Sequence, residues 1–215
     1  MKIVHGNIAV IGGDTHISKW VEETGRLDHD QYALPIILEH IKSGDTVIDV
    51  GAFIGDHTIA YINKVGKDGH VYAFEPNKIA FDCLKHNCPS AAAFNVGLSD
   101  KEEFLSYELA PNAGAGRIKE SGQVKIQTMC LDSLAIKDVS FIKIDVEGFE
   151  MNVLKGAQET ISKFKPSMWI EINETALAAN NCSAEEIENY LSGIGYKTEP
   201  FPEKGDQYDI LCTTK

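Results

Sequence analysis

The chain has 215 residues, of which 43% are hydrophobic and 24% charged, a composition typical of one folded globular domain. This excludes collagen-like, coiled-coil and disordered chains, and no apolar run is long enough to span a membrane. The net charge of −12 repels a phosphate backbone and argues against a nucleic acid partner. Scattered cysteines without a CxxC pair, and a start without signal-peptide features, predict a cytoplasmic protein.

Short apolar runs alternate with helical stretches through most of the chain. Strands are expected at residues 46–50, 69–74, 92–96, 141–145, 168–172 and 208–212. Helices are expected at 30–41, 56–65, 78–87, 148–164 and 183–193, the last with a capping box of Ser183 and Glu186. This alternation predicts a parallel sheet with right-handed crossovers, and the almost wholly apolar strands predict helices on both of its faces.

Two segments do not follow this alternation. Residues 1–45 are expected to form a cap, with a short hairpin, packed on a ligand-binding domain of residues 46–215, within a single domain overall. The region 101–132 is expected to be irregular, and its stretch 111–116 is a candidate mobile loop because it is polar and rich in glycine.

The clearest functional pattern is the buried strand, two-glycine turn and helix start of residues 47–55. Open α/β sheets bind ligands beyond the carboxyl ends of their strands, where Gly51 and Gly55 would let the backbone approach a ligand. Asp49 precedes the turn, and Glu75 ends the next strand near the ~20-residue offset at which a carboxylate binds a ribose diol.

The same turn does not match the usual phosphate-binding motifs. No lysine follows it, as a phosphate-binding loop requires, and Phe53 stands where a dinucleotide site has its second glycine. A carboxylate at Asp49 would also repel a pyrophosphate. A nucleoside with a cationic amino-acid end suits this acidic turn, and S-adenosylmethionine is such a ligand.

The sequence resembles the FkbM family of class I S-adenosylmethionine-dependent methyltransferases. The resemblance is carried by residues 47–55, 71–77, 95–100 (NVGLSD), 131–134 (LDSL), 141–150 (FIKIDVEGFE) and 169–171. FIKIDVEGFE is the most specific of these, whereas Phe53 departs from the asparagine that the family usually carries. The resemblance implies a Rossmann-like α/β fold with a mostly parallel seven-stranded sheet and one antiparallel strand near the C-terminus. It also implies O-methyl transfer to a hydroxyl, with S-adenosylhomocysteine as the product.

Residues around the first turn and the next strand ends are expected to bind the cofactor. They are Asp49, Gly51, Ala52, Phe53, Gly55, Thr58, Glu75, Pro76, Asn77, Gly97 and Asp145. No metal site is predicted, because no group of ligands has the necessary spacing.

Two residues are expected to act in catalysis. Asp145 ends the strand 141–145 and would face the cofactor's amino group or an acceptor hydroxyl. His57 begins a helix, whose N-terminus would keep the imidazole neutral and able to accept a proton. His29 and Asp30 are further candidate bases. Lys143 needs a carboxylate partner in its buried strand, with Glu171 as the first candidate.

The sequence thus predicts S-adenosylmethionine-dependent O-methylation of a sugar or other small-molecule hydroxyl. An N- or RNA methyltransferase is an alternative, which the acidic charge disfavours. A non-catalytic nucleoside-binding regulatory domain is another; it would keep Asp49, Gly51 and Glu75 but lack an acceptor pocket. No pattern in the sequence specifies the acceptor or the oligomeric state.

Overall fold

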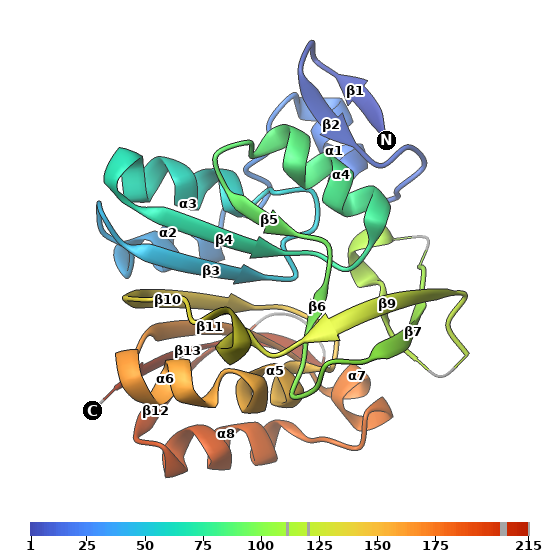
Figure 1. Ribbon diagram of the computed structural model, residues 1–215. Helices are drawn as coiled ribbons and strands as arrows, with labels where there is room; N and C mark the ends of the chain where they lie inside the picture. Colours follow the sequence, from blue (N-terminus) through green and yellow to red (C-terminus); the bar gives the residue numbers. More distant parts are fainter. Residues whose placement is uncertain (111, 120, 203–205, 215) are drawn as a thin grey trace.

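A seven-stranded sheet forms the centre of the structure, a computed structural model that describes residues 1–110, 112–119, 121–202 and 206–214 (Figure 1). Its strands, in spatial order, are β12 (Tyr196–Pro202), β13 (Gln207–Thr214), β11 (Ser167–Asn173), β10 (Val139–Ile144), β3 (Thr46–Val50), β4 (His70–Phe74) and β5 (Ala92–Phe94). β13 is antiparallel to both of its neighbours, and the remaining pairs are parallel. The predicted mostly parallel sheet with one antiparallel strand near the C-terminus is therefore confirmed.

Helices cover both faces of this sheet. One face carries α2 (Ala33–Glu39), α3 (Thr58–Val65) and α4 (Lys78–Asn87), and the other carries α5 (Glu150–Gly156), α6 (Gln158–Phe164) and α8 (Ala184–Gly193). Successive strand residues point to opposite faces, so Val47 packs with the first group and Ile48 with the second. The short helix α7 (Glu174–Ala179) follows β11.

The N-terminal segment packs against α4 beside the first glycine turn (Figure 1). It contains the hairpin of β1 (Lys2–Val4) and β2 (Ile8–Val10), followed by α1 (Ile17–Thr24), which the sequence did not predict. The Asn87 amide on α4 accepts a hydrogen bond from the Ala9 backbone N–H and donates to the Ile54 carbonyl, at 2.8 Å each. One side chain therefore links the hairpin to the turn.

The region predicted to be irregular forms a second, four-stranded sheet. Its strands, in spatial order, are β6 (Gly97–Leu98), β9 (Val124–Met129), β7 (Phe104–Glu108) and β8 (Arg117–Ile118). Within the proposed mobile loop, Ala113–Ala115 forms a 3-10 helix capped by Asn112, while Pro111 lies outside the described residues. Other 3-10 helices are Gly66–Asp68 and Leu131–Leu134. The short strands of this second sheet are defined by their pairing with one another. The two-residue strands β6 and β8 carry no alternating apolar pattern from which the sequence could predict them.

Two further differences have local causes. The helix predicted over 148–164 is divided at Ala157, because the Asp132 carboxylate accepts hydrogen bonds from the backbone N–H groups of Glu159 and Thr160 and so caps a second helix. β12 was not predicted because it contains two prolines, which an edge strand tolerates. The capping box at the start of α8 is confirmed.

Candidate active site

A cavity of about 760 Å³ opens at the carboxyl ends of the central strands, a volume typical of a small-molecule site. Residues that end β3, β4, β10 and β11 line it, and the small sheet and the N-terminal segment complete the wall. The strand order reverses between β3 and β10, which is where open α/β sheets form their ligand crevice.

The two glycines of the first turn serve the packing of the chain itself. Gly51 has a φ of +79°, and a Cβ there would lie 1.8 Å from the Asp145 carbonyl oxygen. Gly55 has a φ of +92°, and a Cβ there would lie 2.6 Å from the sulfur of Cys88, the residue that follows α4. Only Gly51 lines the cavity, so Gly55 allows close contact with α4 and not with a ligand.

Glu75 joins this turn to the end of β4. Its carboxylate accepts hydrogen bonds from the backbone N–H groups of Phe53 (2.9 Å) and Asn77 (2.7 Å), one to each oxygen. Its side chain lines the cavity but is almost fully buried, and this burial raises its pKa to about 7 against the effect of the two hydrogen bonds. Each oxygen keeps a lone pair, so the carboxylate can accept two further hydrogen bonds from a diol.

Asp49 and Thr58 lie behind the cavity wall. Asp49 is fully buried, and the Thr58 hydroxyl donates a hydrogen bond to its Oδ2 at 2.6 Å. Its Oδ1 has no hydrogen-bond partner among the described residues. Burial raises the pKa of Asp49 although Lys143 stabilises its charge. The hydrogen bond between Thr58 and Asp49 connects the start of α3 to the end of β3.

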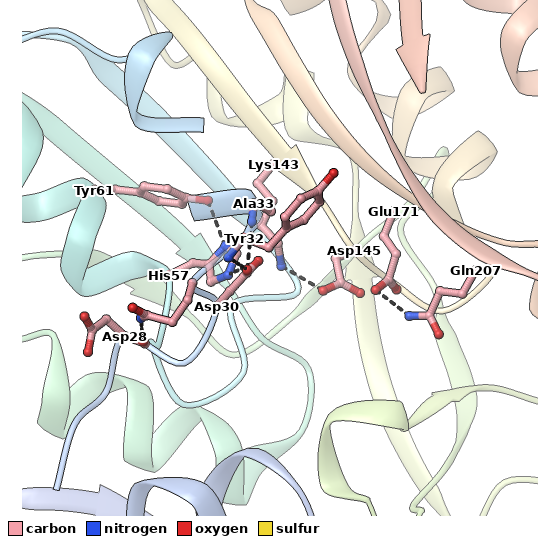
Figure 2. A network of polar contacts seen from close by, with 11 residues as sticks. Asp28, Asp30, Tyr32, Ala33, His57, Tyr61, Lys143, Asp145, Glu171 and Gln207 are labelled. Atoms are coloured by element: carbon pink, nitrogen blue, oxygen red, sulfur yellow. Dashed lines mark hydrogen bonds and ion pairs between the residues drawn. The ribbon is translucent and has the colours of Figure 1, made fainter. Parts of the chain in front are cut away.

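Lys143 and Asp145 form an ion pair on the cavity wall (Figure 2). The Lys143 ammonium donates to Asp145 Oδ2 at 2.8 Å, so the predicted pairing with Glu171 is wrong. In the strand register Lys143 lies opposite Trp169 on β11, which leaves Glu171 beside Asp145. Burial opposes ionisation of Asp145, but the charge of Lys143 and the hydrogen bonds from Glu171 and Lys143 lower its pKa.

Glu171 lies beside this ion pair, and its pKa is shifted in the opposite direction to that of Asp145. Burial and the negative charge of Asp145 raise the pKa of Glu171 well above its usual value, and its carboxyl group is hydrogen-bonded to Asp145. The Gln207 amide donates a hydrogen bond to Glu171 Oε1 at 2.7 Å. Figure 2 shows the two carboxyl groups facing one another from β10 and β11.

His57 is held between Asp30 and Tyr61 (Figure 2). Its Nε2 lies 3.4 Å from Asp30 Oδ2, and its Nδ1 lies 3.2 Å from the Tyr61 hydroxyl. Burial lowers the pKa of His57, but the hydrogen bond to Asp30 and the negative charges of Asp56 and Asp49 together outweigh burial, so the pKa is raised. The direction of this shift is opposite to the lowering that the helix N-terminus was expected to cause, because nearby carboxylates act on the imidazole.

The structure brings only part of the predicted set to the cavity. Those on its wall are Gly51, Phe53, His57, Glu75, Pro76, Gly97 and Asp145. Those behind it are Asp49, Ala52, Gly55, Thr58 and Asn77. Wall residues that the sequence did not single out include Tyr107, Arg117, Asn173, Gln207 and Asp209, and no local pattern marks them. The roles assigned to individual residues remain predictions.

Glu150 stabilises the turn that follows β10. Its Oε1 accepts a hydrogen bond from the Gly148 backbone N–H at 2.9 Å, while its Oε2 is buried without a partner among the described residues. Burial raises its pKa from 4.5 to about 7. The folded state therefore binds this proton more tightly than the unfolded chain, and the stability falls as the pH rises through that range.

We expect Glu150→Ala to lower the free energy of unfolding by roughly 1–3 kcal/mol, because it leaves the Gly148 N–H without an acceptor. Glu150→Gln keeps an acceptor and removes the titrating group. In urea unfolding at pH 5.5 and pH 8, Glu150→Gln should lose less stability between the two values than the unsubstituted chain. An equal loss would show that Glu150 titrates normally.

Comparison with known proteins places the chain among methyltransferases. The family model for the methyltransferase FkbM domain matches residues 49–198. The hexuronic acid methyltransferase AglP of Haloferax volcanii is 34% identical over 149 residues, which are 63% of this chain and 61% of that protein. The chain therefore spans about three fifths of the length of this curated relative.

Solved structures share the fold at low sequence identity. The methyltransferase FkbM from Methylobacillus flagellatus KT aligns over 83% of this chain and 50% of its own, with a TM-score of 0.58 and 18% identity. Fibrillarin from Aeropyrum pernix, in complex with natively bound S-adenosyl-L-methionine, aligns over 87% of this chain and 76% of its own, with a TM-score of 0.53 and 13% identity. The predicted class I methyltransferase fold is confirmed. None of the helices that the structure describes has the length and apolar character needed to cross a bilayer.

Proposed function

The chain belongs to the FkbM methyltransferase family, and on this basis we propose that it transfers a methyl group from S-adenosylmethionine to an oxygen of a sugar. The observation that carries the proposal is the position of Glu75, whose carboxylate lies on the cavity wall at the end of β4, directly beside the first turn. A carboxylate at this point of the fold binds ribose hydroxyls.

The cavity also fits the charge of this methyl donor. Its wall carries the carboxyl groups of Asp30, Asp56, Glu75, Asp145, Glu147, Glu171 and Asp209. An acidic cavity attracts a cation, and S-adenosylmethionine supplies, when bound, an electrophilic methyl group on a positively charged sulfur. The volume of about 760 Å³ has room for the donor and a small acceptor together.

Hydrogen-bonding groups at the ends of β11 and β13 would orient the acceptor. Glu171, Asn173 and Gln207 line the cavity on the side of Asp145 away from the first turn. The amides of Asn173 and Gln207 both donate and accept hydrogen bonds, and the Glu171 carboxyl group adds further oxygen acceptors, as recognition of sugar hydroxyls requires. The printed name of the Haloferax volcanii relative also concerns a sugar, whereas the charge of −12 disfavours RNA.

Asp145 and His57 would have different roles at the reacting oxygen, the first in alignment and the second in proton transfer. Lys143 lowers the pKa of Asp145, which makes that carboxylate a weak base suited to alignment by hydrogen bonding. Asp30 raises the pKa of His57, which makes the imidazole the stronger base and the group to receive the hydroxyl proton. Its two present contacts are long, at 3.2 and 3.4 Å, and an acceptor hydroxyl can replace one of them.

Glu75→Ala should weaken binding of S-adenosylmethionine by about ten- to a hundredfold, because a hydrogen bond to a charged group contributes roughly 1.5–3 kcal/mol. Isothermal titration calorimetry measures the change. Glu147→Gln is the matched control, since it also removes one carboxylate from the cavity wall but lies after β10. Equal affinities for Glu75→Ala and the unsubstituted protein, with both proteins folded, would refute the ribose assignment.

Methyl transfer itself is tested with S-adenosylmethionine labelled in the methyl group. Nitrophenyl glycosides of neutral and acidic sugars serve as acceptors, and mass spectrometry detects the methylated product. We expect incorporation into at least one glycoside, and none when His57 is replaced by phenylalanine. Tight donor binding without transfer to any acceptor would instead favour a non-catalytic nucleoside-binding domain.

A further inference from the structure

Two permanently charged cations lie on the cavity wall among the described residues, Lys143 and Arg117. Lys143 is already neutralised, since it donates to Asp145 and faces Asp49 in the strand register. Arg117 lies on β8 of the small sheet, whereas Lys143 lies on β10 of the central sheet. The positive charge of Lys143 is therefore already paired with carboxylates of the protein, which leaves Arg117 as the candidate to bind an anionic group of a ligand.

Arg117 belongs to a cluster with a surplus positive charge. Its Nε donates to Glu108 Oε2 at 3.3 Å, and Lys119 donates to the other oxygen of the same carboxylate at 2.7 Å. Two cations share one anion, which leaves a net charge of +1. Arg117 lines the cavity, whereas Glu108 and Lys119 do not.

The guanidinium of Arg117 also keeps unused donors. It has five N–H groups, of which Nε–H binds Glu108. The N–H groups on its two terminal nitrogens have no hydrogen-bond partner among the residues that the structure describes. Two parallel N–H groups of this kind match a carboxylate in bidentate geometry.

The rest of the wall would repel an anionic ligand. Glu147 and Asp145 lie on the strand end that faces the reaction, and the charge of Arg117 acts on Glu147 by opposing the rise of its pKa on burial. Arg117 and Asp145 line the same cavity, so Arg117 can anchor one end of a small acceptor whose other end reaches Asp145. A neutral sugar has no group that needs this cation.

We propose that Arg117 binds a carboxylate of the methyl acceptor, so that the preferred acceptor is a uronic acid sugar rather than a neutral hexose. The inference rests on the proposed methyltransferase function and adds to it the residue that selects the acceptor; the uronic acid class agrees with the printed name of the Haloferax volcanii relative. Glu108 acts as a positioning residue, because it holds the guanidinium at the wall through Nε and leaves the terminal nitrogens free.

The test compares two acceptors that differ in one group, p-nitrophenyl β-D-glucuronide and p-nitrophenyl β-D-glucoside. Arg117→Gln should raise KM for the glucuronide about ten- to a hundredfold and leave KM for the glucoside within about threefold. Lys119→Gln is the matched control, because it removes the other cation of the cluster outside the cavity, and it should leave both values within about threefold. Arg117→Lys should restore part of the preference.

Two results would overturn the proposal. One is an unchanged ratio of glucuronide to glucoside efficiency in Arg117→Gln. The other is a loss of S-adenosylmethionine affinity in that variant, which would place the guanidinium on the donor's own carboxylate. If the unsubstituted protein methylates neither glycoside, the proposed function fails. Calorimetric titration of the glucuronide in the presence of S-adenosylhomocysteine then still decides whether Arg117 binds its carboxylate.

Discussion

Gly51→Ala is expected to abolish folding or to lower the free energy of unfolding by more than about 4 kcal/mol. The added Cβ would lie 1.8 Å from the Asp145 carbonyl oxygen and 2.9 Å from its carbonyl carbon. Neither side can move away easily, because the Gly51 N–H donates to Phe74 on β4 and the Asp145 N–H donates to Val50 on β3. The substitution therefore disrupts the contact between the two central strand ends.

Gly44→Ala is the control that distinguishes the effect of the steric clash from the effect of backbone strain. Gly44 also has a positive φ, of +88°, but a Cβ there meets nothing within 4 Å. Gly44→Ala should lower the free energy of unfolding by only roughly 1–2 kcal/mol, the cost of placing alanine in the left-handed backbone conformation. Urea unfolding of both variants measures the difference. Equal stability of the two would mean that the first turn moves away from Asp145 without cost, which would contradict the close packing of β3 and β10.

The central sheet was predictable from the sequence because its signals are local. The helix α4 (Lys78–Asn87) was predicted with its observed ends, since Asn77 caps it and an apolar stripe runs along it. The small sheet was not predictable, because β6 and β8 have two residues each, and each exists only through pairing with another strand, β6 with β9 and β8 with β7. A two-residue strand carries no periodicity that sequence analysis can detect.

The residues of the candidate site also differ in whether the sequence could predict them. Glu75 and Asp145 were predictable, since each follows a buried strand whose carboxyl end meets the others at one edge of the sheet. The partner of Lys143 was not, because it depends on register: Glu171 lies level with Asp145 and not with Lys143. Arg117 reaches the cavity only through the small sheet, so no sequence pattern could identify it.

Phe53 is a bulky residue with a positive φ in the first turn, and tertiary packing compensates for this unfavourable backbone conformation. Its φ of +46° lies in the left-handed region, which asparagine tolerates better than a bulky residue. The phenylalanine is nevertheless buried, in a cluster with Val10 of the N-terminal hairpin and Cys83 of α4. Burial of the aromatic ring by the N-terminal segment offsets the strained backbone. The phenylalanine thus connects the first turn to the N-terminal hairpin of this chain.

Asp145→Asn is expected to lower the affinity for S-adenosylmethionine by about ten- to a hundredfold and to leave turnover at saturating donor within about tenfold. The reason is the state of the carboxylate. Lys143 and Glu171 hold it ionised with a lowered pKa, so it is a poor proton acceptor and a good partner for a positive charge. If it instead received the hydroxyl proton, turnover would fall about 10²–10⁴-fold with little change in affinity.

Calorimetry with both S-adenosylmethionine and S-adenosylhomocysteine identifies the group that Asp145 faces. An equal loss for the two ligands indicates the amino group, which both carry, whereas a larger loss for S-adenosylmethionine indicates the sulfonium. Glu147→Gln is the control, because it removes a cavity charge that is hydrogen-bonded to Asn173 and not paired with Lys143. Asp49 lies opposite Lys143 in the strand register and remains to offset its buried charge, so Asp145→Asn should stay folded. A folded variant with unchanged affinity and turnover would remove Asp145 from the site.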